Sequence, residues 1–211
     1  FRDQFLKTVS DPQLHYYWKH DFPLISRSSL SPLLTRIDTF LRPKIIRMMF
    51  AQKSGLDLAD IVNNNKILLV KLSQGLIGKG NAHLLGTLLV SKLGQVALGR
   101  QALSKDARTP FYIYMDEFHH LMTDSISDML SGVRKYSVGL VLAHQDMKQL
   151  GSDSELAESI LSNPNIRICF RLGDTDAKAL QNGFSGFEMN DLQSLDRGCA
   201  IMRVGGASND F

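Results

Sequence analysis

From residue 66 onward, short apolar runs alternate with longer stretches of helical periodicity. The apolar runs cover residues 67–70, 111–115, 138–143, 166–170 and 200–204, and the helical stretches cover residues 82–98, 124–133, 153–162 and 174–183. Strands that alternate with helices of about ten residues or more need crossover connections, which favour a mostly parallel sheet flanked by helices. The sequence therefore predicts an α/β domain over residues 64–211. Its ligands are expected at the carboxyl ends of the strands.

The first 63 residues have a different pattern, in which nothing alternates with a period of two. Asp11 precedes Pro12, which is typical of a capped helix start, and Pro43 separates two stretches of helical spacing, residues 33–41 and 45–50. The sequence therefore predicts a small all-helical unit over residues 1–63, ahead of the α/β domain.

Composition excludes some classes of protein. With 44% hydrophobic and 21% charged residues, the chain lies in the range of globular proteins and outside that of disordered ones. It has no apolar run of about 18 residues, so we expect no membrane segment within it. The chain starts with Phe1 and has no leader-like segment, so we expect its start to lie inside a longer protein. Cys169 and Cys199 each lie in an apolar run, which predicts buried free thiols in a reducing compartment.

The excess of basic over acidic side chains lies within the first 60 residues of the chain. Residues 1–60 hold nine basic and six acidic side chains, whereas residues 61–211 hold fifteen of each. Residues 42–53 contain four basic side chains and no acid. Such a cluster can contact phosphate groups of DNA, although a solvated helix face is the more ordinary interpretation.

Asp116 and Glu117 directly follow the apolar run 111–115. An apolar strand that ends in Asp-Glu is the Walker B arrangement. The first carboxylate can hold the water shell of Mg²⁺, and the second can orient or deprotonate a water that attacks a γ-phosphate. Strands also end in acidic residues for structural reasons, so this motif alone does not establish the site.

Three further residues are candidates for the same chemistry. Gln145 follows the run 138–143, where an amide can contact an attacking water or a terminal phosphate. Arg134 ends the preceding helical stretch and Arg171 follows the run 166–170, and either could serve as an arginine finger. A polar strand end and a cation at a helix C-terminus also have purely structural interpretations.

Two apparent motifs are rejected. Gly75 to Gly80 contains a Gly-Lys pair, but its glycine spacing is wrong and no Ser or Thr follows Lys79, so it is not a Walker A loop. His119 and His120 are adjacent, and adjacent side chains diverge on a helix or a strand, which disfavours a shared zinc ion. We expect a surface turn at the first motif and packing or solvent exposure at the second.

The order of these features resembles the FtsK/HerA superfamily of hexameric DNA-pumping ATPases. The resemblance covers residues 66–204 and is greatest for the VirD4/TraG/TraD-type coupling proteins of type IV secretion and conjugation and their HerA-like relatives. It rests on the runs ILLVKLSQG, HLLGTLLVSKL, PFYIYMDEFHHL, ISDMLSGVRKYSVGLVLAHQ, ILSNPNIRICFRLGDTDAKAL and AIMRVGG. It implies a RecA-like core, with residues 1–63 as the helical insertion that these proteins carry.

The resemblance also implies roles for the candidate residues. Asp116 matches the Asp that coordinates Mg²⁺ through water, and Glu117 matches the catalytic Glu. Gln145 matches the strand-end sensor glutamine, Arg134 a finger that acts in a neighbouring subunit, and Arg171 an arginine near the subunit interface. The ligands implied are ATP and Mg²⁺.

The implied assembly is a homohexameric ring around DNA that works with type IV secretion components. It is implied to be cytoplasmic, with a parent protein that can be anchored at the inner membrane. No Walker A loop lies in this chain, so we expect the isolated chain to be an inactive monomer. Two alternatives stay open, namely a HerA-like DNA-repair translocase and a non-catalytic docking module that recruits a protein or DNA substrate to a secretion machine.

Overall fold

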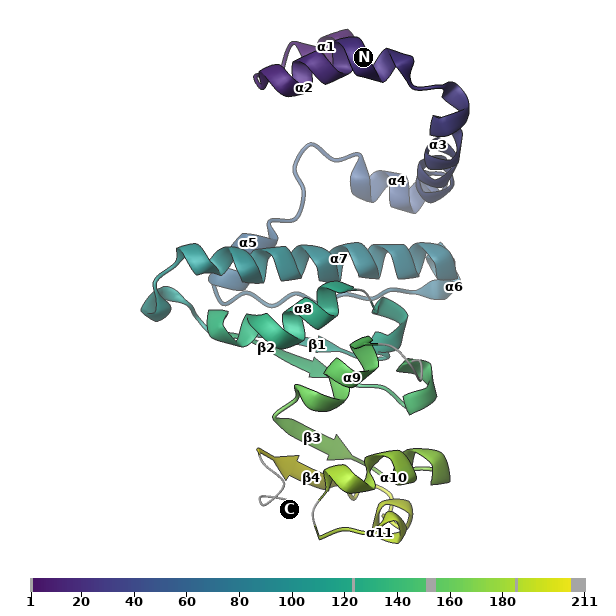
Figure 1. Ribbon diagram of the computed structural model, residues 1–211, viewed down its shortest axis with the longest axis vertical. Helices are drawn as coiled ribbons and strands as arrows, with labels where there is room; N and C mark the ends of the chain where they lie inside the picture. Colours follow the sequence, from purple (N-terminus) through teal and green to yellow (C-terminus); the bar gives the residue numbers. More distant parts are fainter. Residues whose placement is uncertain (1, 123, 151–154, 185, 206–211) are drawn as a thin grey trace. The chain divides into compact units, whose positions relative to one another are not determined.

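The structure is a computed structural model that describes residues 2–122, 124–150, 155–184 and 186–205 (Figure 1). By contacts between Cα atoms, the chain forms two compact units. The first holds residues 1–55 and 75–77, and the second holds residues 56–74 and 78–211. Within the described part, no helix is both long and apolar enough to cross a membrane.

The described elements of the first unit are all helical. Its elements are α1 (Arg2–Leu6), α2 (Pro12–Tyr16), the π-helix η1 (Tyr17–Asp21), the 3-10 turn η2 (Phe22–Leu24), α3 (Arg27–Leu41) and α4 (Lys44–Phe50). Asp11 caps α2 by accepting a hydrogen bond from the backbone N–H of Gln13 at 2.8 Å. Pro43 separates α3 from α4, because proline cannot supply the N–H that a continuous helix needs.

The second unit contains the four strands found among the described residues. Its elements are α5 (Leu58–Asn63), α7 (Lys79–Gly99), η3 (Arg100–Ala102), η4 (Lys105–Ala107), β1 (Phe111–Met115), η5 (Phe118–Leu121), α8 (Asp124–Gly132), η6 (Val133–Tyr136), β2 (Val138–Leu142), η7 (Met147–Leu150), α9 (Glu155–Ser162), β3 (Ile166–Cys169), α10 (Asp174–Leu180), η8 (Gln181–Gly183), α11 (Met189–Gln193) and β4 (Ile201–Val204). The short helix α6 (Gln74–Ile77) spans the boundary between the two units. Helix α5, which we expected in the helical unit, lies in the second unit, where Val62 joins its main core.

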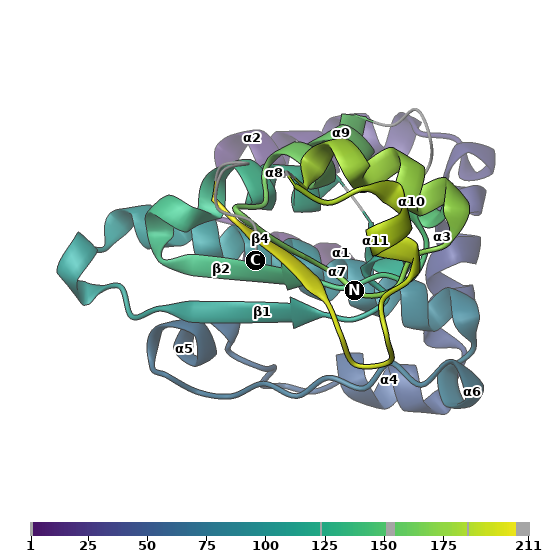
Figure 2. The same ribbon diagram turned by 90° about the horizontal axis from the view of Figure 1, so that it is seen from below.

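The sheet differs from the single mostly parallel sheet that the sequence predicts. Strands β1 and β2 pair in parallel, but β3 and β4 form a separate antiparallel pair. Residues 66–73 run alongside β1 (Figure 2) without forming a strand. Ile67 and Leu69 are 87% and 90% exposed, so this run is not a strand covered on both faces. A strand requires a hydrogen-bonded neighbour, and apolar composition alone does not provide one.

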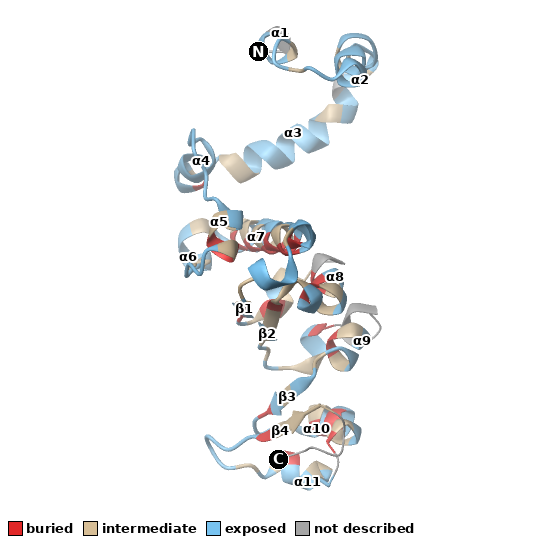
Figure 3. Ribbon diagram, turned by 90° about the vertical axis from the view of Figure 1, so that its left-hand side faces the viewer, coloured by how far each residue is buried: buried red, intermediate tan, exposed pale blue. Residues whose placement is uncertain are grey.

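The main core lies on one face of the β1–β2 pair. Buried side chains of the two strands, such as Ile113 and Val138, pack with residues of α7 and α8, such as Leu93 and Met129. Figure 3 shows buried residues on α7, α8 and the strands, whereas α3 is exposed over most of its length. A smaller core joins β3 and β4 to α10 and α11, and includes Cys169. Cys199 is exposed, contrary to the expectation of two buried thiols, because it follows α11 in the loop before β4.

Arg100, which follows α7, forms hydrogen bonds to the end of α5 and to the residues that precede β1 and β2. Its side chain is 1% exposed, and its guanidinium donates to Asn63 Oδ1 at 3.1 Å, to the carbonyls of Tyr136 and Ser137 at 2.9 and 3.2 Å, and to the carbonyl of Thr109. Burial lowers the pKa of Arg100 from its ordinary value, with a smaller contribution from the charge of Arg108. A buried charge that satisfies this many carbonyls fixes the position of several chain segments at once.

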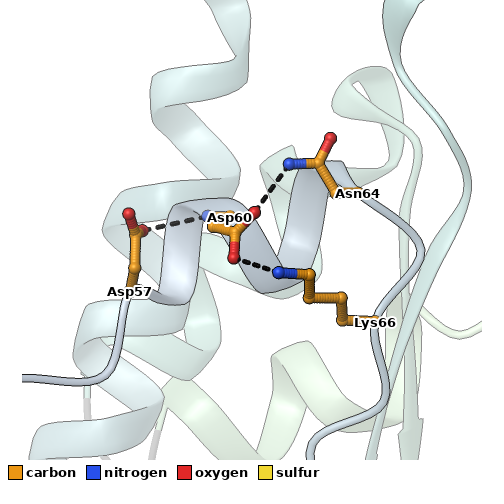
Figure 4. Close-up of polar contacts among 4 residues, drawn as sticks. All are labelled: Asp57, Asp60, Asn64 and Lys66. Carbon is orange, nitrogen blue, oxygen red and sulfur yellow. Dashed lines mark hydrogen bonds and ion pairs between the residues drawn. The ribbon is translucent and has the colours of Figure 1, made fainter.

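A polar network closes α5 at both ends (Figure 4). Asp57 Oδ1 accepts the backbone N–H of Asp60 at 3.0 Å and thereby caps the helix start. Asp60 in turn accepts from Asn64 Nδ2 at 2.7 Å and forms an ion pair with Lys66. The hydrogen bond from Lys66 lowers the pKa of Asp60, with a smaller contribution from Asn64. The network holds the start of the 66–73 segment against the end of α5.

Candidate active site

The carboxyl ends of β1 and β2 lie side by side. In the parallel register Met115 is opposite Leu142, and the backbone N–H of Ala143 donates to the carbonyl of Met115 at 2.9 Å. The backbone N–H of Phe118 returns to the carbonyl of Ala143 at 3.2 Å. These bonds tie the chain after β1 to the chain after β2, so the polar residues that follow the two strands leave the sheet at one edge.

Asp116 and Glu117 form a tight turn directly after β1. Glu117 has a left-handed backbone with φ 49°, and its N–H donates to Asp116 Oδ1 at 3.0 Å. For a residue with a side chain this conformation costs about 1 kcal/mol. The next residue, Phe118, is fully buried and packs edge-on against His144 at 5.4 Å between ring centroids. Burial of Phe118 on the far side of the turn offsets that strain and holds the turn in place.

The two oxygens of the Glu117 carboxylate face different partners. Gln145 Nε2 donates to Oε1, and His119 Nδ1 lies 3.4 Å from Oε2. The Glu117 side chain is 33% exposed, so water can reach it. The structure thus brings together Glu117 and Gln145, which stand 28 positions apart in the sequence.

Asp116 lies beside this pair and is exposed. Mg²⁺ keeps several of its waters and is usually held by one or two carboxylates together with substrate phosphates. An exposed carboxylate whose inner oxygen is fixed by the Glu117 N–H suits that kind of site. Among the described residues, no group of three or more His, Cys, Asp or Glu side chains could hold a metal ion by itself. Asp116 thus fits a hydrated Mg²⁺ that the nucleotide helps to hold.

The two arginine candidates lie apart from this edge. Arg134 is exposed in η6, which precedes β2, so it lies at the amino-terminal end of the strand that Gln145 follows. Five strand residues separate these ends by roughly 17 Å. Arg171 is exposed after β3. Within the described ranges, neither arginine has a hydrogen bond or an ion pair with Asp116, Glu117 or Gln145.

A cavity of about 920 Å³ lies between residues 65–72, α7 and β1. Asp116, Glu117 and His120 line its edge, and most of the remaining lining is aliphatic or aromatic. A triphosphate needs cations and N–H donors, so this lining does not form a phosphate site by itself. Lys79, at the start of α7, also lines the cavity. Gly78, with φ 81°, separates α6 from α7, so the turn expected over residues 75–80 is limited to this glycine and the rest of the segment is helical.

His119 lies in the candidate site, although the sequence predicts only packing or solvent exposure for it. Its ring lies beside the Glu117 carboxylate and 4.0 Å from the ring of His120. No signal in the sequence predicts this contact, because it depends on the left-handed backbone of Glu117.

Comparison with known proteins gives a match to a family model and a match to a solved structure. Residues 110–181 match the family model described as the TraM recognition site of TraD and TraG. The structure is similar to that of the plasmid coupling protein TrwB, solved in complex with the non-hydrolysable GTP analogue GDPNP, with a TM-score of 0.67 and 13% sequence identity. No curated protein sequence matches the chain.

The structural match covers 95% of this chain and 54% of the TrwB chain, so this chain spans about half the length of that protein. At this identity the likeness shows a shared fold. It does not transfer the activity of one protein to the other.

Proposed function

We propose that this chain is part of a ring-forming ATPase that moves DNA through a conjugative type IV secretion machine. The match of residues 110–181 to the TraD and TraG family model and the likeness of the fold to that of TrwB support this proposal. The observation that carries the proposal is the meeting of Glu117 and Gln145 at the shared edge of two parallel strands, next to the exposed Asp116.

Each residue then has one task. Asp116 holds the water shell of Mg²⁺, which neutralises phosphate charge when it is bound with the nucleotide. Glu117 orients the attacking water and accepts its proton, since its side chain is 33% exposed and can be reached by water. Gln145 holds the other oxygen and, by releasing it, can pass the state of the nucleotide to the loop after β2.

Arg134 is proposed to act on a neighbouring subunit. Its place at the opposite end of β2 keeps it from the carboxylates of its own subunit. An exposed arginine there can enter the site of the next subunit in a ring of six. Arg171, exposed after β3, is proposed to lie near the same interface.

The test uses a longer form of the protein that includes an upstream phosphate-binding loop. Glu117→Gln should lower DNA-stimulated ATP turnover by about 10²–10⁴ while nucleotide affinity is kept, because the amide cannot accept the proton. Glu158→Gln, at an exposed position on α9, is the matched control and should turn over like the wild type. Undiminished turnover of Glu117→Gln would refute the role of Glu117.

Mixing two inactive variants tests the shared site. Arg134→Ala should also lose turnover, by about 10³ or more if it acts as a finger. A mixture with Glu117→Gln should recover part of the activity, because some interfaces then combine an intact arginine with an intact carboxylate. Absence of recovery at every mixing ratio would contradict a finger that acts between subunits.

A second function is favoured by the description of the matching family model. It names a TraM recognition site of TraD and TraG, and on this basis we propose that residues 110–181 of this chain bind a TraM-like protein. Such docking does not require hydrolysis and keeps the docking-module alternative open. Binding of a TraM-like protein to this chain by calorimetry, undiminished by Glu117→Gln, would support it. Lack of binding would leave hydrolysis as the sole proposed function.

A further inference from the structure

His119 has a buried nitrogen without a hydrogen-bond partner in the described part of the chain. The side chain is 9% exposed and lies in η5, one turn beyond the strand end. Its Nδ1 forms no hydrogen bond there, and it points to within 3.4 Å of Glu117 Oε2. A buried polar atom left unpaired costs about 1–3 kcal/mol, so such atoms almost always have a partner in the working state of a protein.

Among the described residues, Glu117 is the acceptor that the structure places beside the unpaired nitrogen of His119. The ring of His120 lies against it at 4.0 Å and is tilted by 48°, which restricts its rotation. The backbone carbonyl of His120 is already engaged by His83 Nδ1. Glu117 Oε2 is the carboxylate oxygen that faces His119, and a small rotation of the half-exposed Glu117 side chain turns this approach into a hydrogen bond.

We propose that His119 is the positioning residue of the hydrolytic site, in which its Nδ1–H donates to Glu117 Oε2 while Gln145 holds Oε1. This inference rests on the function proposed above. A carboxylate held at both oxygens by groups from two segments keeps one orientation toward its water. Without His119 the carboxylate is tied at one oxygen only and can turn into solvent, so fewer encounters have the geometry that proton transfer needs.

Three substitutions separate a donor effect from a packing effect. Asparagine places its amide nitrogen on Cγ, as histidine does with Nδ1, and so keeps the donor in place. Phenylalanine keeps the ring volume but has no donor, and glutamine places its nitrogen one atom farther away. His120→Phe, which keeps the ring contact on His119, is the matched control.

In the longer form of the protein, His119→Phe should lower kcat about tenfold with KM for ATP unchanged. His119→Asn should restore most of the turnover, and His119→Gln should not. A merely structural role would instead make Phe the best tolerated of the three. Wild-type kcat in His119→Phe, alongside an inactive Glu117→Gln, would overturn the positioning role and leave the proposed function in place.

A second measurement, on this chain, does not depend on hydrolysis. Nitrogen NMR of the imidazoles should show Nδ1 of His119 protonated, and Glu117→Leu should shift the population toward the other tautomer. If the longer form hydrolyses no ATP, the proposed function fails and this measurement still decides the contact. A His119 tautomer that is insensitive to Glu117→Leu would overturn the inference.

Discussion

The two units of the molecule differ in how their apolar side chains are used. In the described part of the first unit, Ile46 is the only buried hydrophobic residue, although α3 and α4 carry many large apolar side chains. Leu33, Leu34, Met48 and Met49 are all more than half exposed. The second unit holds the other buried hydrophobic residues of the described part, and all of these except Ile61 and Ala82 belong to two clusters.

The difference shows that local signals and core formation are separate requirements. The first unit has good caps, such as Asp11 on α2 and Ser26 on α3, and ring contacts such as that of Phe40 with Phe50 at 5.1 Å. These features define helices, but they bury little apolar area, and burial supplies most of the folding free energy. We therefore expect the first unit to open far more readily than the second.

The largest expected effect is a difference in the unfolding free energy that is lost when Arg100 or Arg42 is substituted. Arg100→Met should lower the free energy of unfolding of the second unit by about 3–5 kcal/mol, because it leaves several buried carbonyls without a donor. Arg42→Met removes an exposed ion pair with Asp38, so the first unit should lose less than about 1 kcal/mol. Both losses of unfolding free energy can be measured by unfolding each variant in urea, with amide hydrogen exchange as the probe of each unit. If Arg100→Met and Arg42→Met lower the unfolding free energy by equal amounts, then the two units do not differ in how firmly their side chains are held.

A smaller contrast compares two isoleucines that are both fully buried. Ile126→Ala should cost the second unit about 2–5 kcal/mol, since the cavity lies inside a dense cluster. Ile46→Ala should cost the first unit less, because few buried neighbours surround it. Trp18, the single tryptophan, lies in the first unit and reports its unfolding by fluorescence. If Ile46→Ala is the costlier change, then the first unit has a core of its own.

The smallest expected effect is a difference in thiol reactivity between Cys169, in the smaller core of the second unit, and Cys199, outside it. Burial raises the pKa of Cys169 to about 11, partly offset by the charge of Arg167, whereas Cys199 is exposed. A thiol reacts as its thiolate, so at pH 8 Cys199 should be labelled by a disulfide reagent within minutes. Cys169 should react only after unfolding, or faster as the pH rises toward 11. Equal labelling rates at pH 8 would place both thiols outside the core.

Much of the second unit could be predicted from the sequence because periodicity reports burial. The strands at 111–115, 138–142 and 166–169 and the helix α7 fall where the apolar patterns indicated, and the resemblance to TraG/TraD-type coupling proteins is confirmed over residues 110–181. The parallel pairing of β1 with β2 was predicted, and with it the shared edge that joins Glu117 to Gln145.

The sequence pattern could not predict features that depend on contacts between segments far apart in the chain. Residues 67–70 are apolar enough for a strand, yet no strand pairs with them in the structure. The direction of β4 follows from the connection through α11, and apolar content says nothing about it. The contact of His119 with Glu117 depends on a left-handed turn at a glutamate, which no propensity predicts.

The pairing of the strands in twos has a practical consequence for the purified chain. Each strand in the described sheets has a partner on one side only, so its other side presents main-chain N–H and C=O groups in a regular row. Such rows accept strands from other molecules, and β1 adds the exposed rings of Tyr112 and Tyr114 beside its row. We expect a concentrated solution of the chain to form fibrillar aggregates slowly through these unpaired strand edges. This aggregation should occur under conditions in which the core of the second unit is still folded.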